Sequence, residues 1–328
     1  MTGSTGPGAG GAKQPPGRVE IAAPDISPYR AGNTGIAFVT TLDSGRPGPH
    51  VLVSALVHGN ELCGAHALVF LFERGIGPRR GKLSLGFFNT EAFQRFDPAN
   101  PSASRYVDED FNRVWHPAVL DGTRTSVELR RARELRPLLD TADLLLDVHS
   151  MQTTTQPLML AGPLDKGVEL ARRVGAPELV VVDGGHAAGR RMRDYAGFGD
   201  AASRKNALLV ECGQHWMRET AEVAIDTVLR FLIATQAIDA ADAVRHRALP
   251  RPPAQRVIRV TEAVTVKTPD FAFVEDYSGL EVIPVAGTVI ARDGAEEVRT
   301  PYDDCVLIMP SRRLAPGLTA VRLGRFSA

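Results

Sequence analysis

Apolar runs that end in polar residues, and that alternate with helical segments, constrain the fold of this chain most. Residues 49–59 contain the run HVLVSALVHG, and residues 61–74 follow it with helical spacing. Further strand-like runs lie at 82–89, 143–149, 179–183 and 207–212, and helices are expected at 127–140, after the capping residue Ser126, and at 219–237. This alternation predicts an α/β domain with a mostly parallel, mixed sheet flanked by helices.

Changes in composition predict the domain boundaries. Residues 1–17 are rich in Gly and Pro and predict a disordered leader, so the α/β domain is expected over 18–240. Residues 241–255 end in several prolines and predict a linker. Short β-type runs separated by turn signals such as Asp293-Gly294 then predict a small all-β domain over 256–328.

Charge and cysteine content exclude several classes of protein. The 328 residues include 38 Lys and Arg against 38 Asp and Glu, and a net charge of zero argues against a nucleic-acid binder. Neither an apolar run of membrane-spanning length nor the apolar region of a signal peptide is present. Three scattered cysteines are typical of reduced thiols. We therefore expect a cytoplasmic protein that does not bind membranes; a homo-oligomer is compatible with the sequence.

Polar residues at the ends of the predicted strands are the main candidates for chemistry. These are His58 with Glu61, His149 and Glu211, and open α/β sheets bind ligands at this edge. Two histidines and one carboxylate are the protein ligands of many catalytic zinc sites, in which a bound water becomes a nucleophile. Glu211, in the apolar run ALLVEC, suits the separate carboxylate that accepts its proton. Each residue also has a structural interpretation, a strand-end histidine or a buried, salt-bridged carboxylate.

A second candidate is the loop SRYVDEDFNRVW at residues 104–115. Apolar residues alternate with its charged residues and are expected to anchor it, although its composition also suits a solvated loop. Arg105 and Arg113 are the residues suited to binding a carboxylate or polarising a carbonyl.

Four motifs in order resemble one enzyme family. They are HGNELCG at 58–64, RYVDEDFNR at 105–113, DVHS at 147–150 and VECG at 210–213. Together they resemble the aspartoacylase and succinylglutamate desuccinylase family, relatives of the zinc carboxypeptidases. The resemblance implies a zinc-carboxypeptidase-like α/β domain, with a small C-terminal β domain capping the site.

The resemblance also implies a role for each matching residue. His58, Glu61 and His149 match the ligands of one zinc ion per chain, and Glu211 matches the general acid and base. Arg105 matches the residue that polarises the scissile carbonyl. Asn112 and Arg113 match a pair that holds a substrate carboxylate. Tyr302, in TPYDD, more loosely resembles a tyrosine that contacts the substrate from the β domain.

The chain departs from the family pattern near the substrate. Where some members carry another arginine about ten residues before the catalytic glutamate, this chain has Ala201, and the nearest arginine is Arg204. Residues 184–199 form a glycine-rich stretch that contains Arg190, Arg191 and Arg193. It is interpreted either as a lid or specificity loop, whose arginines gather near the zinc, or as a mobile solvated loop. His215 has no partner pattern and is interpreted as structural.

The sequence thus predicts a zinc-dependent amidohydrolase that deacylates a small N-acylated amino acid or amine. Its partner is expected to be a small molecule bearing a carboxylate, not nucleic acid. Two alternatives remain open: a metallocarboxypeptidase acting on peptides, and a non-catalytic zinc or small-ligand binding protein on a hydrolase scaffold.

Overall fold

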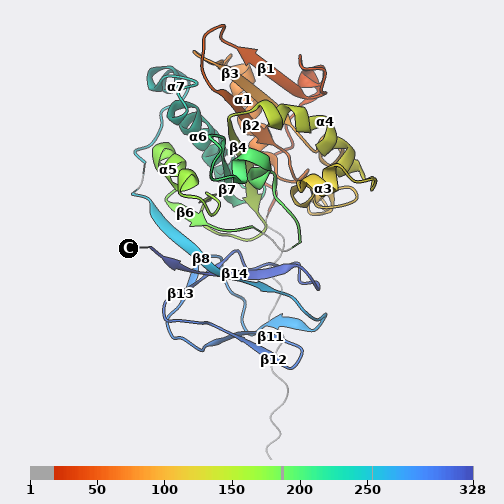
Figure 1. Cartoon of the computed structure of the whole chain (residues 1–328), viewed down its shortest axis with the longest axis vertical. Helices are drawn as coiled ribbons and strands as arrows, with labels where there is room; N and C mark the ends of the chain where they lie inside the picture. The colour runs from red at the N-terminus through yellow and green to blue at the C-terminus, as the bar shows by residue number, and fades with distance from the viewer. Residues whose placement is uncertain (1–17, 186–187, 253, 328) are drawn as a thin grey trace, which may run out of the picture.

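A computed structural model describes residues 18–185, 188–252 and 254–327 of the chain (Figure 1). Within these residues, eleven strands form one sheet, in the spatial order β1 (Val39–Asp43), β3 (Lys82–Phe87), β2 (His50–Ala55), β4 (Leu144–Met151), β7 (Asn206–Gln214), β5 (Leu158–Leu160), β6 (Leu179–Val182), β8 (Arg256–Thr265), β14 (Thr319–Phe326), β13 (Cys305–Ile308) and β10 (Glu281–Ile283). A second, three-stranded sheet contains β12 (Glu296–Arg299), β11 (Val289–Asp293) and β9 (Phe271–Phe273). The expected leader at 1–17 lies outside the described residues.

The sheet is mixed, as the sequence predicts. Strands β3, β2, β4 and β7 run parallel to one another, whereas β1 pairs antiparallel with β3, and β5 pairs antiparallel with β7. The C-terminal strands pair antiparallel with one another. They join the rest of the sheet because β8 pairs in parallel with β6. The C-terminal β region is therefore continuous in hydrogen bonding with the α/β sheet.

Helices cover both faces of the parallel strands (Figure 1). They are α1 (Leu62–Glu73), α2 (Thr90–Phe93), α3 (Pro117–Leu120), α4 (Val127–Thr141), α5 (Asp165–Val174), α6 (Arg218–Ala234) and α7 (Ala240–His246). Short 3-10 turns lie at Ser27–Tyr29, Ala103–Arg105, Phe111–Arg113, Met192–Asp194 and Ala196–Gly199. Helix α4 begins where the sequence predicts, because the Ser126 side chain accepts a hydrogen bond from the Leu129 amide. Helix α7 occupies the start of the segment expected to be a linker.

Alternation along each strand divides the core between the two faces. In β2, Val51 and Val53 pack in the cluster that includes buried residues of α1, α5 and α6. Leu52, between them, packs in the cluster that includes buried residues of α4. Because both faces are covered, these strands are apolar throughout, and polar residues of their motifs gather at the carboxyl edge.

No helix of the described residues has the length and apolar character needed to cross a membrane.

Candidate metal centre and its pocket

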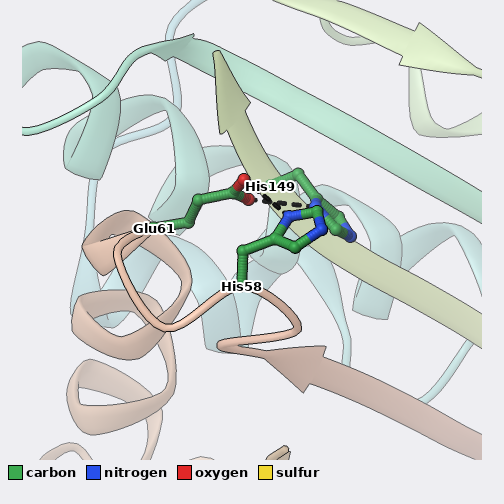
Figure 2. A group of neighbouring side chains, drawn as sticks. All are labelled: His58, Glu61 and His149. Carbon is green, nitrogen blue, oxygen red and sulfur yellow. Dashed lines mark hydrogen bonds and ion pairs between the residues drawn. The ribbon is translucent and has the colours of Figure 1, made fainter. Parts of the chain in front are cut away.

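Three side chains meet at the carboxyl edge of the sheet. His58 lies in the loop after β2, Glu61 is the residue that immediately precedes α1, and His149 lies in β4 (Figure 2). Their potential ligand atoms all lie within 4.8 Å of one another. The Nδ1 atoms of His58 and His149 lie 2.7 and 2.9 Å from the two Glu61 carboxylate oxygens. The fold therefore brings the three predicted residues together.

The outer nitrogen of each histidine faces a carboxylate. His58 Nε2 lies 3.0 Å from Asp110 Oδ1, and His149 Nε2 lies 2.8 Å from Asp147 Oδ2. Asp147 is oriented in turn by the Ser54 hydroxyl, which donates to its Oδ1 over 2.8 Å. A carboxylate behind a ligating histidine typically fixes the tautomer and leaves the inner nitrogen free to bind a metal.

The charges at this point suit a bound cation. Burial alone raises the pKa of Glu61, but His58 and His149 together hold it well below its usual range. Burial opposes a charge on His149, yet Asp147 and Glu61 raise its pKa well above the ordinary value. Since the surroundings favour positive charge between the imidazoles and Glu61, the donor set fits a metal such as zinc.

Glu211 lies on the strand next to His149. The two residues are register partners in the parallel ladder between β4 and β7. The Glu211 carboxylate is buried, faces the pocket, and has one oxygen without a hydrogen-bond partner among the described residues. Burial raises the pKa of Glu211 to about 8. A carboxyl with such a pKa is suited to taking up and releasing a proton near neutral pH.

Arg105 reaches the metal centre from the loop at 104–115. Its guanidinium lies 3.2 Å from Glu61 Oε1 and 3.1 Å from Asp110 Oδ2. The Gly59 amide donates to the Arg105 carbonyl over 3.0 Å. A Cβ at Gly59 would lie 2.4 Å from the backbone nitrogen of Phe93, so only glycine permits this close approach.

Glu128 of α4 holds the same loop from behind. Its buried carboxylate accepts hydrogen bonds from the backbone amides of Val107, Asp108 and Glu109, over 2.7, 3.1 and 3.2 Å. Phe111 and Trp115 anchor the loop in the core, as expected. The loop is thus structured by its surroundings and is not a solvated loop.

Asn112 and Arg113 line the same pocket. The Asn112 side-chain oxygen accepts from the Met192 amide over 2.8 Å, and Arg113 donates to the Asn112 carbonyl over 2.8 Å. Burial, together with the charges of Arg105, Arg191 and Arg322, lowers the pKa of Arg113 to about 10, although Asp110 opposes this shift. An anion bound here would relieve the repulsion among these cations.

The pocket has a volume of about 250 Å³. Beyond the metal centre, its walls include Arg191 and, from β14 and the loop between β13 and β14, Met309, Ser311, Arg313 and Arg322. The site is therefore closed on one side by residues far along the chain.

Tyr302, expected to contact the substrate from the β domain, is not among the residues that line this pocket. Tyr302 lines a different hollow, together with Arg325 and Phe326, and its hydroxyl bonds Thr261 over 2.5 Å. It follows the second sheet in a turn that does not reach the metal centre. Arg204 is exposed and does not line the pocket.

In the described part of 184–199, two of the three arginines are buried, and both have partners within the chain. Arg191 is buried and forms ion pairs with Asp194 and Asp183 over 2.6 and 3.1 Å. Arg193 is also buried and donates to the carbonyls of Ala161 and Ala207. Arg190 is exposed, so of the three arginines only Arg191 lines the pocket.

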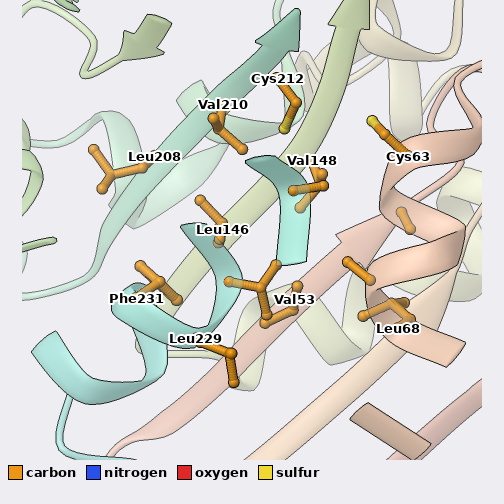
Figure 3. Packing of buried hydrophobic residues seen from close by; sticks show 14 of the residues in the cluster. Val53, Cys63, Leu68, Leu146, Val148, Leu208, Val210, Cys212, Leu229 and Phe231 are labelled. Atoms are coloured by element: carbon orange, nitrogen blue, oxygen red, sulfur yellow. The ribbon is translucent and has the colours of Figure 1, made fainter. Parts of the chain in front are cut away.

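The cysteines next to the site face the core. Cys63 and Cys212 follow Glu61 and Glu211 closely in sequence, but both pack in the apolar cluster beside Val148 (Figure 3). As predicted, Cys212 lies on the opposite face of β7 from Glu211.

Comparisons with known proteins agree with this fold. The family model described as the succinylglutamate desuccinylase/aspartoacylase catalytic domain matches residues 47–235 of this chain. The structure is similar to that of a succinylglutamate desuccinylase from Vibrio parahaemolyticus, at 16% identity, with a TM-score of 0.64 over 89% of this chain and 87% of that one. It is also similar to an aspartoacylase family protein from Mesorhizobium loti, at 19% identity, with a TM-score of 0.60 over 88% and 89%.

The chain therefore belongs to the succinylglutamate desuccinylase/aspartoacylase family, whose members are deacylases. Among curated proteins, it is similar to the rat N-acyl-aromatic-L-amino acid amidohydrolase (carboxylate-forming), with 28% identity over 127 residues. That match covers 36% of this chain and 38% of the rat protein.

Proposed function

We propose that this chain is a zinc-dependent hydrolase that cleaves the amide bond of a small N-acylated amino acid. The proposal rests on one observation above all. The His58–Glu61–His149 trio lies in the same pocket as Glu211, one of whose carboxylate oxygens has no hydrogen-bond partner among the described residues.

His58, Glu61 and His149 would hold the metal, with Asp110 and Asp147 fixing the two imidazoles. When bound, zinc supplies Lewis acidity, which polarises a carbonyl and lowers the pKa of a water molecule.

The chain's own residues supply the proton transfers and the charge stabilisation. Glu211 accepts the proton of the attacking water and later delivers it to the nitrogen of the leaving amine. The Arg105 guanidinium, fixed by Glu61 and Asp110, is placed to stabilise negative charge that develops on the carbonyl oxygen.

Asn112 and Arg113 are proposed to hold a carboxylate on the amino-acid part of the substrate. Arg113 is half-buried and surrounded by other arginines, so a bound carboxylate neutralises repulsion that the free pocket leaves in place.

The limited volume of the pocket favours small substrates over peptides. Residues of the C-terminal region line it, and about 250 Å³ suits a small molecule better than an extended chain. This supports the proposal that the C-terminal region, expected as a domain over 256–328, caps the site.

Two variants test the division of roles. Glu211→Gln is expected to retain stoichiometric zinc but to lose about 10²–10⁴-fold in turnover of N-acetyl, N-formyl or N-succinyl amino acids. Glu61→Gln is expected to lose the metal itself. Metal content is measured on the purified proteins, and turnover by release of the free amine.

If Glu211→Gln instead lost its zinc and Glu61→Gln kept it, the roles of ligand and base would have to be exchanged. A wild-type protein that binds zinc but hydrolyses no amide in the panel would contradict the proposed reaction.

A further inference from the structure

His215 is a rigidly held residue beside the metal centre for which the proposed reaction has no role. It follows β7, is 1% exposed and lines the pocket. Its backbone amide donates to the Met151 carbonyl over 2.8 Å. The adjacent Trp216 donates through Nε1 to the Asn60 carbonyl over 2.8 Å, which ties this turn to the loop that carries His58.

The imidazole of His215 has one partnered and one unpartnered nitrogen. Nδ1 lies 2.7 Å from the Ser150 hydroxyl. Nε2 is buried and has no hydrogen-bond partner in the described part of the chain. The Ser150 backbone amide, in turn, donates to Glu61 Oε2 over 3.1 Å, so the pair lies next to the metal ligands.

The contact with Ser150 determines the tautomer of His215. If Nδ1 carried the proton, the Ser150 hydroxyl hydrogen would have no acceptor among the described residues, and Nε2 would present only a lone pair. If the hydroxyl instead donates to Nδ1, Ser150 is satisfied and the proton lies on Nε2. The second arrangement leaves a single buried N–H on a residue that lines the pocket.

A buried N–H without an acceptor destabilises the folded chain, so such a group calls for a partner that arrives from outside the chain. We propose that His215 Nε2–H donates a hydrogen bond to an oxygen that the acyl group of the substrate carries in addition to its scissile carbonyl. This inference rests on the proposed function, because it takes the scissile amide to lie at the metal centre.

The contacts of His215 and Arg113 come from different walls of the pocket. His215 bonds the Ser150 hydroxyl, and the Ser150 amide bonds Glu61 at the start of α1. Arg113 lies in the loop at 104–115 and donates to the Asn112 carbonyl, and the Asn112 side chain bonds the Met192 amide. With the amino-acid carboxylate at Arg113, the acyl group extends toward His215.

The test uses two variants that each keep one nitrogen position of the imidazole. His215→Asn retains an amide near the Nδ1 position, within reach of Ser150, but its side chain is too short to place a donor at the Nε2 position. His215→Gln places an amide N–H near the Nε2 position. Both are compared with wild type by zinc content and by melting temperature, which control for damage to the fold.

Three ligands of matched shape test the role of this acyl oxygen. They are the same amino acid acylated with a succinyl, a 4-oxopentanoyl or a 4-methylpentanoyl group, and only the last has no oxygen at C4 of the acyl chain. Their Kd values are measured by calorimetry on zinc-loaded proteins that also carry Glu211→Gln, so that binding is read without turnover; turnover is measured separately in proteins that keep Glu211. His215→Asn is expected to weaken binding of the two oxygen-bearing ligands about tenfold and to leave 4-methylpentanoyl binding unchanged. His215→Gln is expected to restore most of the loss.

Equal weakening of all three ligands in His215→Asn, or no weakening of any, would overturn the inference. Selective weakening without turnover of any ligand by wild type would support the inference while contradicting the proposed hydrolysis. The binding and turnover readings therefore separate failure of the inference from failure of the reaction.

Discussion

At the scale of single residues, the metal trio was predictable, but the groups that support it were not. His58, Glu61 and His149 stand where apolar runs end, and parallel strands bring such ends to one edge. Asp147 had a usable signal, since residues two apart in a strand face the same side. Asp110 had none, because it lies in an irregular loop and reaches His58 only through the tertiary fold.

Tyr302 shows the limit of a short local match. TPYDD places a tyrosine in the C-terminal β region, but sequence similarity does not say which way a turn of that region faces. Here the Arg325 guanidinium stacks over the Tyr302 ring at 3.7 Å, in a hollow separate from the metal centre. The C-terminal residues that do line the pocket, including Arg313 and Arg322, belong to no matched motif.

The carboxylates behind the histidines lead to a prediction about metal affinity. Asp147→Asn and Asp110→Asn each remove one negative charge from an outer imidazole nitrogen, which makes the inner nitrogen a poorer ligand. Each variant is expected to bind zinc about 10–100-fold more weakly than wild type. Competition with a chelator of known affinity measures the change.

Asp270→Asn, at an exposed position, serves as the control and is expected to bind zinc as wild type does. Unchanged affinity in both test variants, with the fold intact by circular dichroism, would show that Asp110 and Asp147 do not tune the metal site.

At the scale of elements, the regular helices and strands followed from the sequence and the irregular segments did not. Helix α4 has a capping serine and a run of good helix formers, whereas α7 lies close to the prolines that suggested a linker. The glycines of the segment containing Met192 and Phe198 left two interpretations open from sequence, a lid or specificity loop and a mobile solvated loop. Both side chains are buried, and that depends on the rest of the fold.

The connection between α4 and the loop at 104–115 gives a prediction at this scale. Glu128→Gln keeps the shape of the side chain but removes the charge that attracts three backbone amides. We expect the free energy of unfolding to fall by about 1–3 kcal/mol, because hydrogen bonds to a charged group are weakened. We also expect kcat/KM to fall, since this loop carries Arg105 and Arg113.

Glu134→Gln, on the same helix, is the matched control, because Glu134 is exposed and forms a surface ion pair with Arg131 at 3.1 Å. Denaturant unfolding and steady-state kinetics on the two variants give the comparison. A Glu128→Gln protein as stable and active as Glu134→Gln would mean that the loop does not depend on this carboxylate.

At the scale of the whole molecule, the C-terminal region shares a sheet and an apolar cluster with the α/β region, which its composition did not suggest. The change of composition after the prolines predicted a separate small domain, but composition does not reveal that β8 pairs with β6. An apolar cluster also crosses this junction: Leu160 and Leu209 come from the α/β region, and Val306 and Ile308 come from β13. We therefore propose that the two regions, distinct in architecture, unfold as one unit.

Calorimetry tests this proposal. The zinc-free protein is expected to show one thermal transition whose calorimetric and van't Hoff enthalpies agree, because separating the regions would break the β6–β8 ladder and expose the shared cluster. Ile308→Ala, at a fully buried position, is expected to destabilise that single transition by about 2–5 kcal/mol. Val285→Ala, at a position 61% exposed, should leave it nearly unchanged. If Ile308→Ala instead split the transition, with a small early component and an α/β region melting as in wild type, the regions would be independent domains that only touch.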